Sequence, residues 1–540
     1  MAKVFSGEKT LLDPILCPVE KMIYKLSAVN SKEEQNWIEY TKALILFNLL
    51  GTVFLYLILR LQTFLPLNPC KCSSISSDLA FNISSSFTSN TNWQSYVPEG
   101  LISYFTEMLG LTVQNFLSAA VGIAASIAFI RALAGEQGKG IGNFWVDLVR
   151  STLWILLPLS FVFSLIFVFE GVPQNLSPPV EAKTIEGKTQ IILQGPVASR
   201  ESIKELGTNG GGFFNANSAH PYENPTPLTN FLQLIAIFLI GAGLTNTFGR
   251  MVKDERQGWV LFSAMAILFL FGVFATYYFE TAGNPLFKDL HAPLNMEGKE
   301  VRFGIIGSVL YAIITTAASC GAVNSMHDSF LPLSGMIPLI NIMLGEIIIG
   351  GVGVGLSGMF LFAIIAVFIA GLMVGRTPEY LGKKIETKEI KMSVLAVLIL
   401  PLCVHCFSAL ACTTPWGIKG PLNPGPHGFS EIIYAFSSAG GNNGSAFAGI
   451  SANTFFYNLT TGLAMLIGRF FIIIPTLAIA GSLVRKKVVP PSSGTLPTTG
   501  LTFVFYLILV IIGVGGLVYF PALSLGPIVE HFLLLNGKTF

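Results

Sequence analysis

Four short polar clusters divide this sequence at nearly even intervals, and each follows an apolar stretch too short to cross a bilayer. Their centres lie roughly 110 to 120 residues apart, which leaves room for a membrane helix on either side of each cluster. The clusters run from Ser89 to Asn92, Thr208 to Gly212, Ser319 to Ala322, and Gly440 to Gly444. This pattern predicts a fourfold internal repeat around one axis, which is the symmetry that an ion pathway needs.

Composition indicates that lipid is the main solvent of this chain. Of its 540 residues, 52% are hydrophobic and 11% are charged, well below the roughly 25% charge of soluble domains. A net charge of +2 leaves no general basic field, so we expect a bilayer and no nucleic acid as partner. The first forty residues are mixed and charged, which predicts no secretory signal peptide.

Nine apolar runs are long enough to span, since a span needs about 20 residues. They lie near 43–66, 112–133, 148–169, 229–249, 258–280, 336–373, 392–413, 455–482 and 501–522. A shorter apolar stretch precedes each polar cluster, such as Phe303 to Ala317 or Phe429 to Ser438, and is a candidate re-entrant helix. The predicted repeat is therefore helix, half-helix, polar strand, helix; the alternative is that the clusters are ordinary external loops.

Lysine and arginine in short loops predict the orientation. Four alternate loops carry these residues and are assigned to the cytoplasm: Arg131, Lys139 and Arg150; Arg250, Lys253 and Arg256; Arg376, Lys383, Lys384, Lys388 and Lys391; Arg485, Lys486 and Lys487. The four clusters then all face outside, and the N-terminus faces the cytoplasm.

The run from Met336 to Gly375 is too long for one straight helix, because about 40 residues would reach roughly 60 Å. The glycines in its middle are the expected breakers: Gly350, Gly351, Gly353, Gly355 and Gly358. A broken helix would place a loop below the pore as a gate. The alternative is close packing of helices through small residues.

The chemistry of the clusters favours a monovalent cation. Glycine leaves the backbone free to turn its carbonyls inward, and rows of carbonyls replace the hydration shell of such an ion. No cluster carries a charge, whereas a divalent ion would favour carboxylates. Potassium is therefore the expected ligand, with no organic cofactor.

Several polar residues outside the clusters admit two interpretations. Charges in apolar spans are functional candidates, and these are Glu346, Arg376 and Arg469; buried ion pairs or snorkelling are the alternatives, and Arg60 fits the latter. His327 and Asp328 could belong to a membrane enzyme or could brace a filter. Cysteines are scattered; Cys70 with Cys72, and Cys403 with His405 and Cys406, are more typical of packing than of metal or disulfide sites.

Longer motifs around the clusters closely resemble the KdpA family, the potassium-binding and translocating subunits of bacterial Kdp potassium-transporting ATPases. The resemblance runs from about residue 36 to the end. It rests on residues 90–94 (Asn-Thr-Asn-Trp-Gln), 207–215 (Gly-Thr-Asn-Gly-Gly-Gly-Phe-Phe-Asn), 318–323 (Ala-Ser-Cys-Gly-Ala-Val), 375–384 (Gly-Arg-Thr-Pro-Glu-Tyr-Leu-Gly-Lys-Lys) and 442–447 (Asn-Asn-Gly-Ser-Ala-Phe).

The resemblance implies an all-α polytopic membrane protein: four pseudo-symmetric M1-P-M2 repeats around a central selectivity filter, plus an additional C-terminal helix. The expected segments are a cytoplasmic N-terminal segment over residues 1–40, repeats 41–134, 135–250, 251–391 and 392–487, and a linker with the last helix at 488–540. Family members carry a further first helix that residues 1–40 lack, so a missed upstream start or a shortened variant is expected.

The resemblance also implies where the ion binds and passes. The expected filter residues are Ser89, Asn90, Thr91, Asn92, Gln94, Thr208, Asn209, Gly210, Gly211, Ser319, Cys320, Gly321, Gly440, Gly441, Asn442, Asn443 and Gly444. The expected tunnel or gate residues are Glu346, Gly350, Gly351, Gly353, Arg376 and Arg469.

The implied partners are a P-type ATPase subunit (KdpB), an accessory subunit (KdpC) and a small membrane peptide (KdpF), in the bacterial inner membrane. ATP is expected to be used by the partner, because this chain has neither a phosphate-binding Gly-x-x-x-x-Gly-Lys-Ser/Thr loop nor an Asp-Lys-Thr-Gly phosphorylation motif. The remaining alternatives are an autonomous channel or secondary transporter of the same superfamily, and a membrane enzyme that uses His327 and Asp328.

Overall fold

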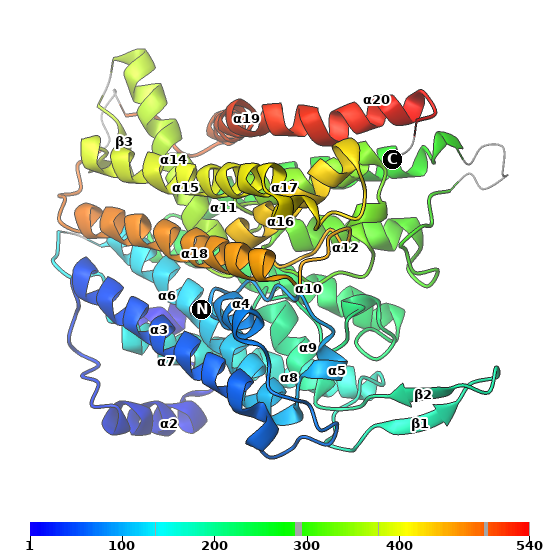
Figure 1. Cartoon of the computed structure of the whole chain (residues 1–540). Helices are drawn as coiled ribbons and strands as arrows, with labels where there is room; N and C mark the ends of the chain where they lie inside the picture. Colours follow the sequence, from blue (N-terminus) through cyan, green and yellow to red (C-terminus); the bar gives the residue numbers. More distant parts are fainter. Residues whose placement is uncertain (136, 287–293, 376, 491–494, 539–540) are drawn as a thin grey trace.

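The computed structural model is a bundle of helices, most of which run side by side across the view in Figure 1. It describes residues 1–135, 137–286, 294–375, 377–490 and 495–538. Two short antiparallel hairpins are its strands: β1 (Val180–Lys183) with β2 (Thr189–Ile192), and β3 (Glu379–Tyr380) with β4 (Lys383–Lys384). The first hairpin projects from the bundle at the lower right of Figure 1.

Within the described residues, nine helical segments are long and apolar enough to cross a membrane, which confirms the predicted number. They are Trp37–Phe64, Thr106–Ala134, Phe144–Phe169, Pro227–Met251, Glu255–Thr281, Val354–Val374, Thr387–Thr413, Phe455–Leu483 and Leu501–Leu535. The corresponding helices are α3 (Trp37–Leu61), α6 (Val113–Ala134), α7 (Phe144–Arg150) with α8 (Leu157–Phe169), α10 (Pro227–Met251), α11 (Glu255–Thr281), α14 (Val354–Val374), α15 (Thr387–Thr413), α18 (Phe455–Leu483), and α19 (Leu501–Leu523) with α20 (Val529–Leu535).

Four shorter helices interrupt this series, one before each polar cluster. They are α4 (Ser77–Thr88), α9 (Val197–Leu206), α12 (Gly304–Ala317) and α17 (Gly425–Gly441). Each lies between two longer segments, so the order of helix, half-helix, polar strand and helix occurs four times. Helix α4 of the first repeat packs against α18 of the fourth: the Asn82 amide donates to the Asn458 carbonyl at 2.9 Å and to the Thr461 hydroxyl at 2.8 Å.

The expectation that all four half-helices are apolar is wrong for α9. It carries Arg200, Glu201, Lys204 and Glu205, and all four are buried. Buried charges are tolerated when they are paired. Here Arg200 pairs with Glu107, and the Lys204 ammonium lies within 4 Å of three carboxylates, those of Glu201, Glu205 and Glu223.

The long apolar run of the third repeat is two helices with a non-helical segment between them. Helix α13 (Pro332–Met343) ends ten residues before α14 begins. Gly350, Gly351 and Gly353 lie in this segment, which we call the break loop (344–353), whereas Gly355 and Gly358 lie inside α14. Ile349 has φ of 53°, a conformation that a β-branched residue adopts only when its surroundings enforce it.

The remaining helices are short and connect these elements. They are α1 (Ala2–Ser6), α2 (Asp13–Leu26), α5 (Pro98–Leu101) and α16 (Pro415–Ile418). The main hydrophobic core centres on α6 and α14, and the stacked rings of Phe129 and Phe360 join the two helices. Local signals set helix ends as usual: the Asn36 side chain accepts from the Glu39 amide at the start of α3, and the Asn36 amide donates to the Glu39 carboxylate, which makes a capping box.

Candidate ion filter

The carboxyl ends of the four half-helices lead directly into the four polar clusters. The residue that turns each chain out of its helix has a left-handed backbone: Asn90 (φ 68°), Thr208 (φ 47°), Ser319 (φ 55°) and Asn442 (φ 60°). A half-helix presents partial negative charge at this end. Four such ends would favour a cation between the strands that follow, which we call filter strands 1 to 4 in chain order.

Backbone φ alternates in sign along three of these strands. Two residues after the first left-handed position, Asn92, Gly210 and Gly444 again have positive φ, of 53°, 82° and 95°. Alternation of this kind lets successive carbonyls face the same side of a strand. Strand 3 departs from the pattern, because Gly321 has no positive φ.

Four buried carbonyl oxygens at equivalent positions accept no hydrogen bond from any donor in the described residues of the chain. They belong to Thr91, Asn209, Cys320 and Asn443, and all four residues are fully buried. Buried carbonyls are almost always paired. A carbonyl without a donor at the same position of every strand is the kind of group that a desolvated monovalent cation takes as a ligand.

The four strands form a closed ring. Strand 1 holds strand 2 by side-chain amides: Asn90, Asn92 and Gln94 donate to the carbonyls of Gly207, Gly210 and Gly212 at 3.1, 3.0 and 3.0 Å. Strand 3 holds strand 4 through Ser319 and the Asn442 carbonyl at 3.1 Å. Strand 4 returns to strand 1 through Asn442 and the Thr91 hydroxyl at 3.0 Å.

Strands 2 and 3 approach so closely that only glycine fits. A Cβ on Gly210 would lie 2.1 Å from the Cα of Gly321. A Cβ on Gly444 would lie 1.7 Å from the Thr91 carbonyl oxygen, at the contact of strands 4 and 1. The ring therefore places together all four groups of sequence-predicted filter residues, with the amides of strand 1 bonded to strand 2.

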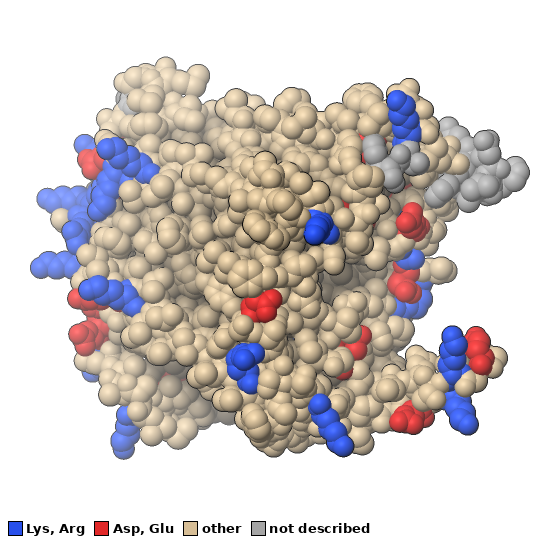
Figure 2. Space-filling view, viewed as in Figure 1, with Lys and Arg blue, Asp and Glu red and all other residues tan. Residues whose placement is uncertain are grey.

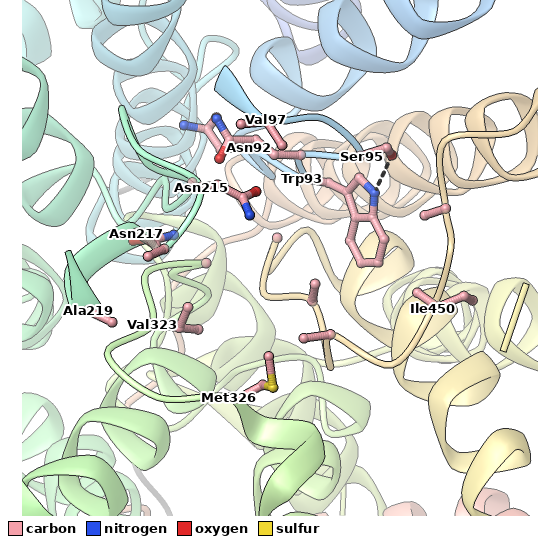
Figure 3. Close-up of a pocket in the computed structure, with 18 of the residues that line it drawn as sticks. Asn92, Trp93, Ser95, Val97, Asn215, Asn217, Ala219, Val323, Met326 and Ile450 are labelled. Atoms are coloured by element: carbon pink, nitrogen blue, oxygen red, sulfur yellow. Dashed lines mark hydrogen bonds between the residues drawn. The ribbon is translucent and has the colours of Figure 1, made fainter. Parts of the chain in front are cut away.

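One end of the ring opens into a cavity of about 750 Å³, shown in Figure 3. Asn92, Trp93 and Asn215 lie around this cavity, and the Trp93 indole donates to the Ser95 hydroxyl at 2.9 Å. The charged residues among its lining are Lys299 and Glu300. The Lys299 ammonium is neutralised by Glu280 at 2.7 Å, and burial lowers the pKa of Lys299 more than Glu280 raises it. A cation entering here meets mainly neutral polar groups.

The break loop closes the opposite end of the ring. The Val352 amide donates to the Thr208 hydroxyl at 3.0 Å, and a Cβ on Gly351 would lie 2.5 Å from that of Ser319. The loop also rests on two helices behind it. A Cβ on Gly353 would lie 2.0 Å from the Gly122 carbonyl of α6, and one on Gly241 of α10 would lie 2.8 Å from the Ile349 carbonyl.

Glu346 and Arg469 are both buried, at 1% and 4% exposure, and neither has an ion-pair partner among the residues that the structure describes. The Glu346 carboxylate makes no close hydrogen bond there, although the side chains of Ser319 and Asn443 lie beside it, and a Cβ on Gly441 would be 3.9 Å from Glu346 Cδ. Arg469 donates to the Ser118 carbonyl at 2.9 Å. The ion-pair interpretation of these two residues is therefore wrong for the residues described.

The structure also shows the contacts of the other polar candidates that it describes. Arg60 donates to the Ile75 carbonyl at a helix end, and Arg376 lies outside the described residues. The His327 ring contacts the Tyr434 hydroxyl at 2.8 Å, which reaches Ser445 at 2.8 Å; His327 therefore braces filter strand 4. Asp328 instead contacts His427 at 2.9 Å.

Sequence patterns did not reveal the residues of α6 that support strands 1 and 2. The Asn115 side chain accepts from Asn92 at 2.7 Å, and Ser118 donates to Asn90 at 2.8 Å. A signal was present, since Gln114, Asn115 and Ser118 are polar residues inside an apolar span. They lie on one helical face at i, i+1 and i+4 spacing.

Comparison with known proteins gives one consistent result. The family model KdpA, "Potassium-transporting ATPase A subunit", matches residues 1–532, which includes the first 35 residues that the sequence motifs had not covered. Relatives named potassium-transporting ATPase potassium-binding subunit occur in Methylorubrum extorquens and Brucella anthropi. Each is 59% identical over 541 residues, covering 100% of this chain and 95% of the relative.

A solved structure shares the fold at low sequence identity. The crystal structure of the potassium transporter TrkH from Vibrio parahaemolyticus aligns with a TM-score of 0.52 and 12% identity, over 79% of this chain and 83% of that one. The helical architecture with nine candidate spans and this structural neighbour confirm the predicted fold class. The full-length match to the family model and the identity to its relatives show that the chain belongs to the KdpA family.

Proposed function

We propose that this chain is the potassium-binding and translocating subunit of an ATP-driven potassium uptake complex. Its filter is formed by the residues of strands 1 to 4, and a partner P-type ATPase subunit hydrolyses ATP. The observation that carries the proposal is the set of unpaired carbonyls, one per strand, at Thr91, Asn209, Cys320 and Asn443. The names of the relatives support the ion and the association with an ATPase.

The proposed path continues sideways from the inner end of the filter. A small, mainly apolar cavity of about 70 Å³ lies between repeats 3 and 4, next to the break loop and the end of α17. Its lining includes Gly345, Ile347, Gly441, Asn442 and Gly468. Glu346, between two of these residues in sequence, would attract the cation to this cavity, and the break loop with Gly350, Gly351 and Gly353 would act as the gate. We include Arg376 and Arg469 in the same proposal, as residues of this path.

The proposed orientation has the cavity of Figure 3 outside the cell, in the inner membrane of a bacterium. Basic side chains gather at the left edge of Figure 2, over the ends of α14, α15 and α18. Lys384, Lys388, Arg485 and Lys487 are exposed there. Positive residues in short loops favour the cytoplasmic side. An accessory subunit (KdpC) and a small membrane peptide (KdpF) complete the proposed complex, and the four repeats and flanking segments keep the boundaries given above.

Reconstitution tests this function directly. Liposomes that contain the chain with its P-type ATPase partner should take up ⁸⁶Rb⁺ or K⁺ only with ATP, and K⁺ should stimulate ATP hydrolysis. Liposomes with the chain alone measure the alternative of an autonomous channel. ATP-independent uptake by the chain alone, at the rate of the complex, would contradict the proposal, as would ATP hydrolysis by the chain alone.

Replacing Gln94 with arginine is expected to weaken the apparent K⁺ affinity about tenfold, the equivalent of about 1.4 kcal/mol. The change adds a cation at the mouth of the filter. It also removes the acceptor that holds the Gly212 amide at 2.9 Å and the donor that holds the Gly212 carbonyl at 3.0 Å. K⁺-stimulated ATPase titrations measure the effect, and Gln94→Met is the control that removes both bonds without a charge. Equal affinities for the arginine variant and wild type would rule out a place for Gln94 in the filter.

Replacing Glu346 with glutamine is expected to lower K⁺ turnover about tenfold, because one charge a few ångströms from a cation contributes a few kcal/mol before screening. Thermal stability should hardly change, since the two donors beside this carboxylate, Ser319 and Asn443, also donate to the carbonyls of Asn442 and Thr315. Glu346→Asp keeps the charge and is the matched control. A glutamine variant that transports normally, or that unfolds at a much lower temperature, would show that the carboxylate is structural.

A further inference from the structure

A histidine outside the filter lies among three carboxylates, one from its own helix and two from other places in the fold. His427, in the first turn of α17, has its Nδ1 2.7 Å from Glu530 Oε1 on α20. Its Nε2 is 2.9 Å from Asp328 Oδ1, in the short 3₁₀ turn His327–Ser329, and 3.9 Å from Glu431 Oε1, one turn further along α17. None of the four residues lines the cavity at the filter mouth.

The ring cannot satisfy these neighbours in its neutral form without a cation. A neutral imidazole has one N–H donor, and donation from Nδ1 to Glu530 leaves a lone pair on Nε2 facing Asp328. Two acceptors at 2.9 Å repel each other unless a proton or a metal ion lies between them. Carboxylates lie at both ring nitrogens, and a third lies 3.9 Å from Nε2. The arrangement therefore needs a cation, either a second proton on the ring or a metal ion.

The distances suit a metal ion. Nε2 of His427 and one oxygen each of Asp328 and Glu431 all lie within 4.8 Å of one another. Tetrahedral zinc with bonds of about 2.0–2.2 Å separates its ligands by roughly 3.3 Å, and the separations of 2.9 and 3.9 Å bracket this value. Glu530 would orient the ring through Nδ1, as carboxylates do for metal-binding histidines.

Gly449 packs closely against the cluster, at a position where only glycine fits. A Cβ there would lie 2.1 Å from Glu431 Oε1 and 2.7 Å from Asp328 Oδ1. Partial burial favours metal binding further: the His427 side chain is 15% exposed, Asp328 14% and Glu431 0%. Three carboxylates thus share one ring in a half-buried place. Leu422 and Asn423 donate hydrogen bonds to Glu431, but no lysine or arginine pairs with any of the three among the described residues, which leaves negative charge for a divalent ion.

We propose that Asp328, His427 and Glu431 form a binding site for a divalent transition-metal ion of the zinc class, with Glu530 as the positioning residue. The site joins the segment that follows filter strand 3, the fourth half-helix and the last helix. The Asp328 amide donates to the Phe447 carbonyl at 2.8 Å, just beyond filter strand 4. A bound ion would fasten the outer end of this strand to α20.

Zinc titration of the full-length protein tests the site. The protein is purified in detergent without a polyhistidine tag, stripped with a chelator and titrated with Zn²⁺ by calorimetry. We expect one Zn²⁺ per chain, an affinity about 100-fold weaker in His427→Gln and in Glu431→Gln, and 10–100-fold weaker in Glu530→Gln. Zn²⁺ should also raise the unfolding temperature of wild type and not of the ligand variants.

Two further variants make the result decisive. His405→Gln removes a histidine that lies between Cys403 and Cys406, and it should leave zinc binding unchanged. Asp328→Asn changes the size of the side chain very little and should still weaken Zn²⁺ binding. It therefore tests the site independently of any folding defect in the His427 variant. Absence of Zn²⁺ binding by wild type, or equal binding by wild type and the folded ligand variants, would overturn the site and leave His427 as a protonated clamp. The outcome is independent of K⁺ transport.

Discussion

Replacing Gly210 with aspartate is expected to weaken the apparent affinity for K⁺ by roughly 100-fold, the equivalent of about 2.7 kcal/mol. Two effects act in the same direction. Gly210 has φ of 82°, and its Cβ would lie 2.1–2.2 Å from backbone atoms of Gly321, so strands 2 and 3 must separate. The separation also moves the neighbouring Asn209 carbonyl away from its three equivalents, and the ion loses some of its coordination.

K⁺-stimulated ATP hydrolysis of the complex measures this change, with Rb⁺ and Na⁺ titrations as a readout of selectivity. Gly187→Asp is a matched control, because Gly187 has φ of 80° and nothing lies within 4 Å of its Cβ position. It adds the same charge and the same backbone strain in the exposed turn between β1 and β2. If both variants keep the wild-type K⁺ affinity and selectivity, strand 2 does not belong to the filter.

Replacing Lys204 with methionine is expected to destabilise the protein by about 3–5 kcal/mol, the usual cost of removing one partner from a buried ion pair. Lys204 is fully buried, and its ammonium lies 2.7 Å from Glu201, 3.4 Å from Glu205 and 2.7 Å from Glu223. Three carboxylates would remain without their cation. Glu223 also accepts from the Phe214 amide at 2.7 Å, so the loss extends to the segment that follows strand 2.

Thermal unfolding in detergent, followed by intrinsic fluorescence, measures the loss of stability. Lys188→Met, on the exposed β1–β2 hairpin, is the control for removal of a lysine charge. Adding Glu201→Gln and Glu223→Gln to the Lys204 variant should recover some of the stability, because fewer charges are then left unpaired. A Lys204→Met protein that unfolds at the wild-type temperature would show that these carboxylates are neutral in the native state.

Much of the fold could be predicted because lipid imposes a simple length rule on apolar segments. The nine candidate spans differ from the predicted runs mainly at their ends, for instance Thr106–Ala134 against 112–133. The break before Val354 followed from length and from glycine. Gly355 and Gly358 are nevertheless helical, because packing allows the helical hydrogen bonds to form at these positions. The sequence alone does not specify the residue at which a helix starts.

The filter strands of the candidate site could be predicted from the sequence, but many of the residues that support these strands could not. Hydropathy treats Glu201, Lys204 and Glu205 as residues of an external loop, because it cannot pair them with Glu223 or bury them against a neighbouring helix. Likewise, Asn90, Asn92 and Gln94 are among the predicted filter residues, but their side-chain amides bond to strand 2 in the structure. Their bonds to strand 2 depend on the distance between two strands that lie about 118 residues apart in the chain, which no local pattern encodes.

The closed ring of four different strands has a consequence for how such a pore can vary. In a pore built from four identical subunits, one codon change appears four times around the axis, so every alteration is symmetrical and its effect is multiplied. Here Gly210, Gly321 and Gly444 are encoded separately, and a substitution touches one quarter of the circumference. Each quarter can therefore be adjusted alone, and variants that alter a single quarter can reveal which side of a bound ion limits its binding.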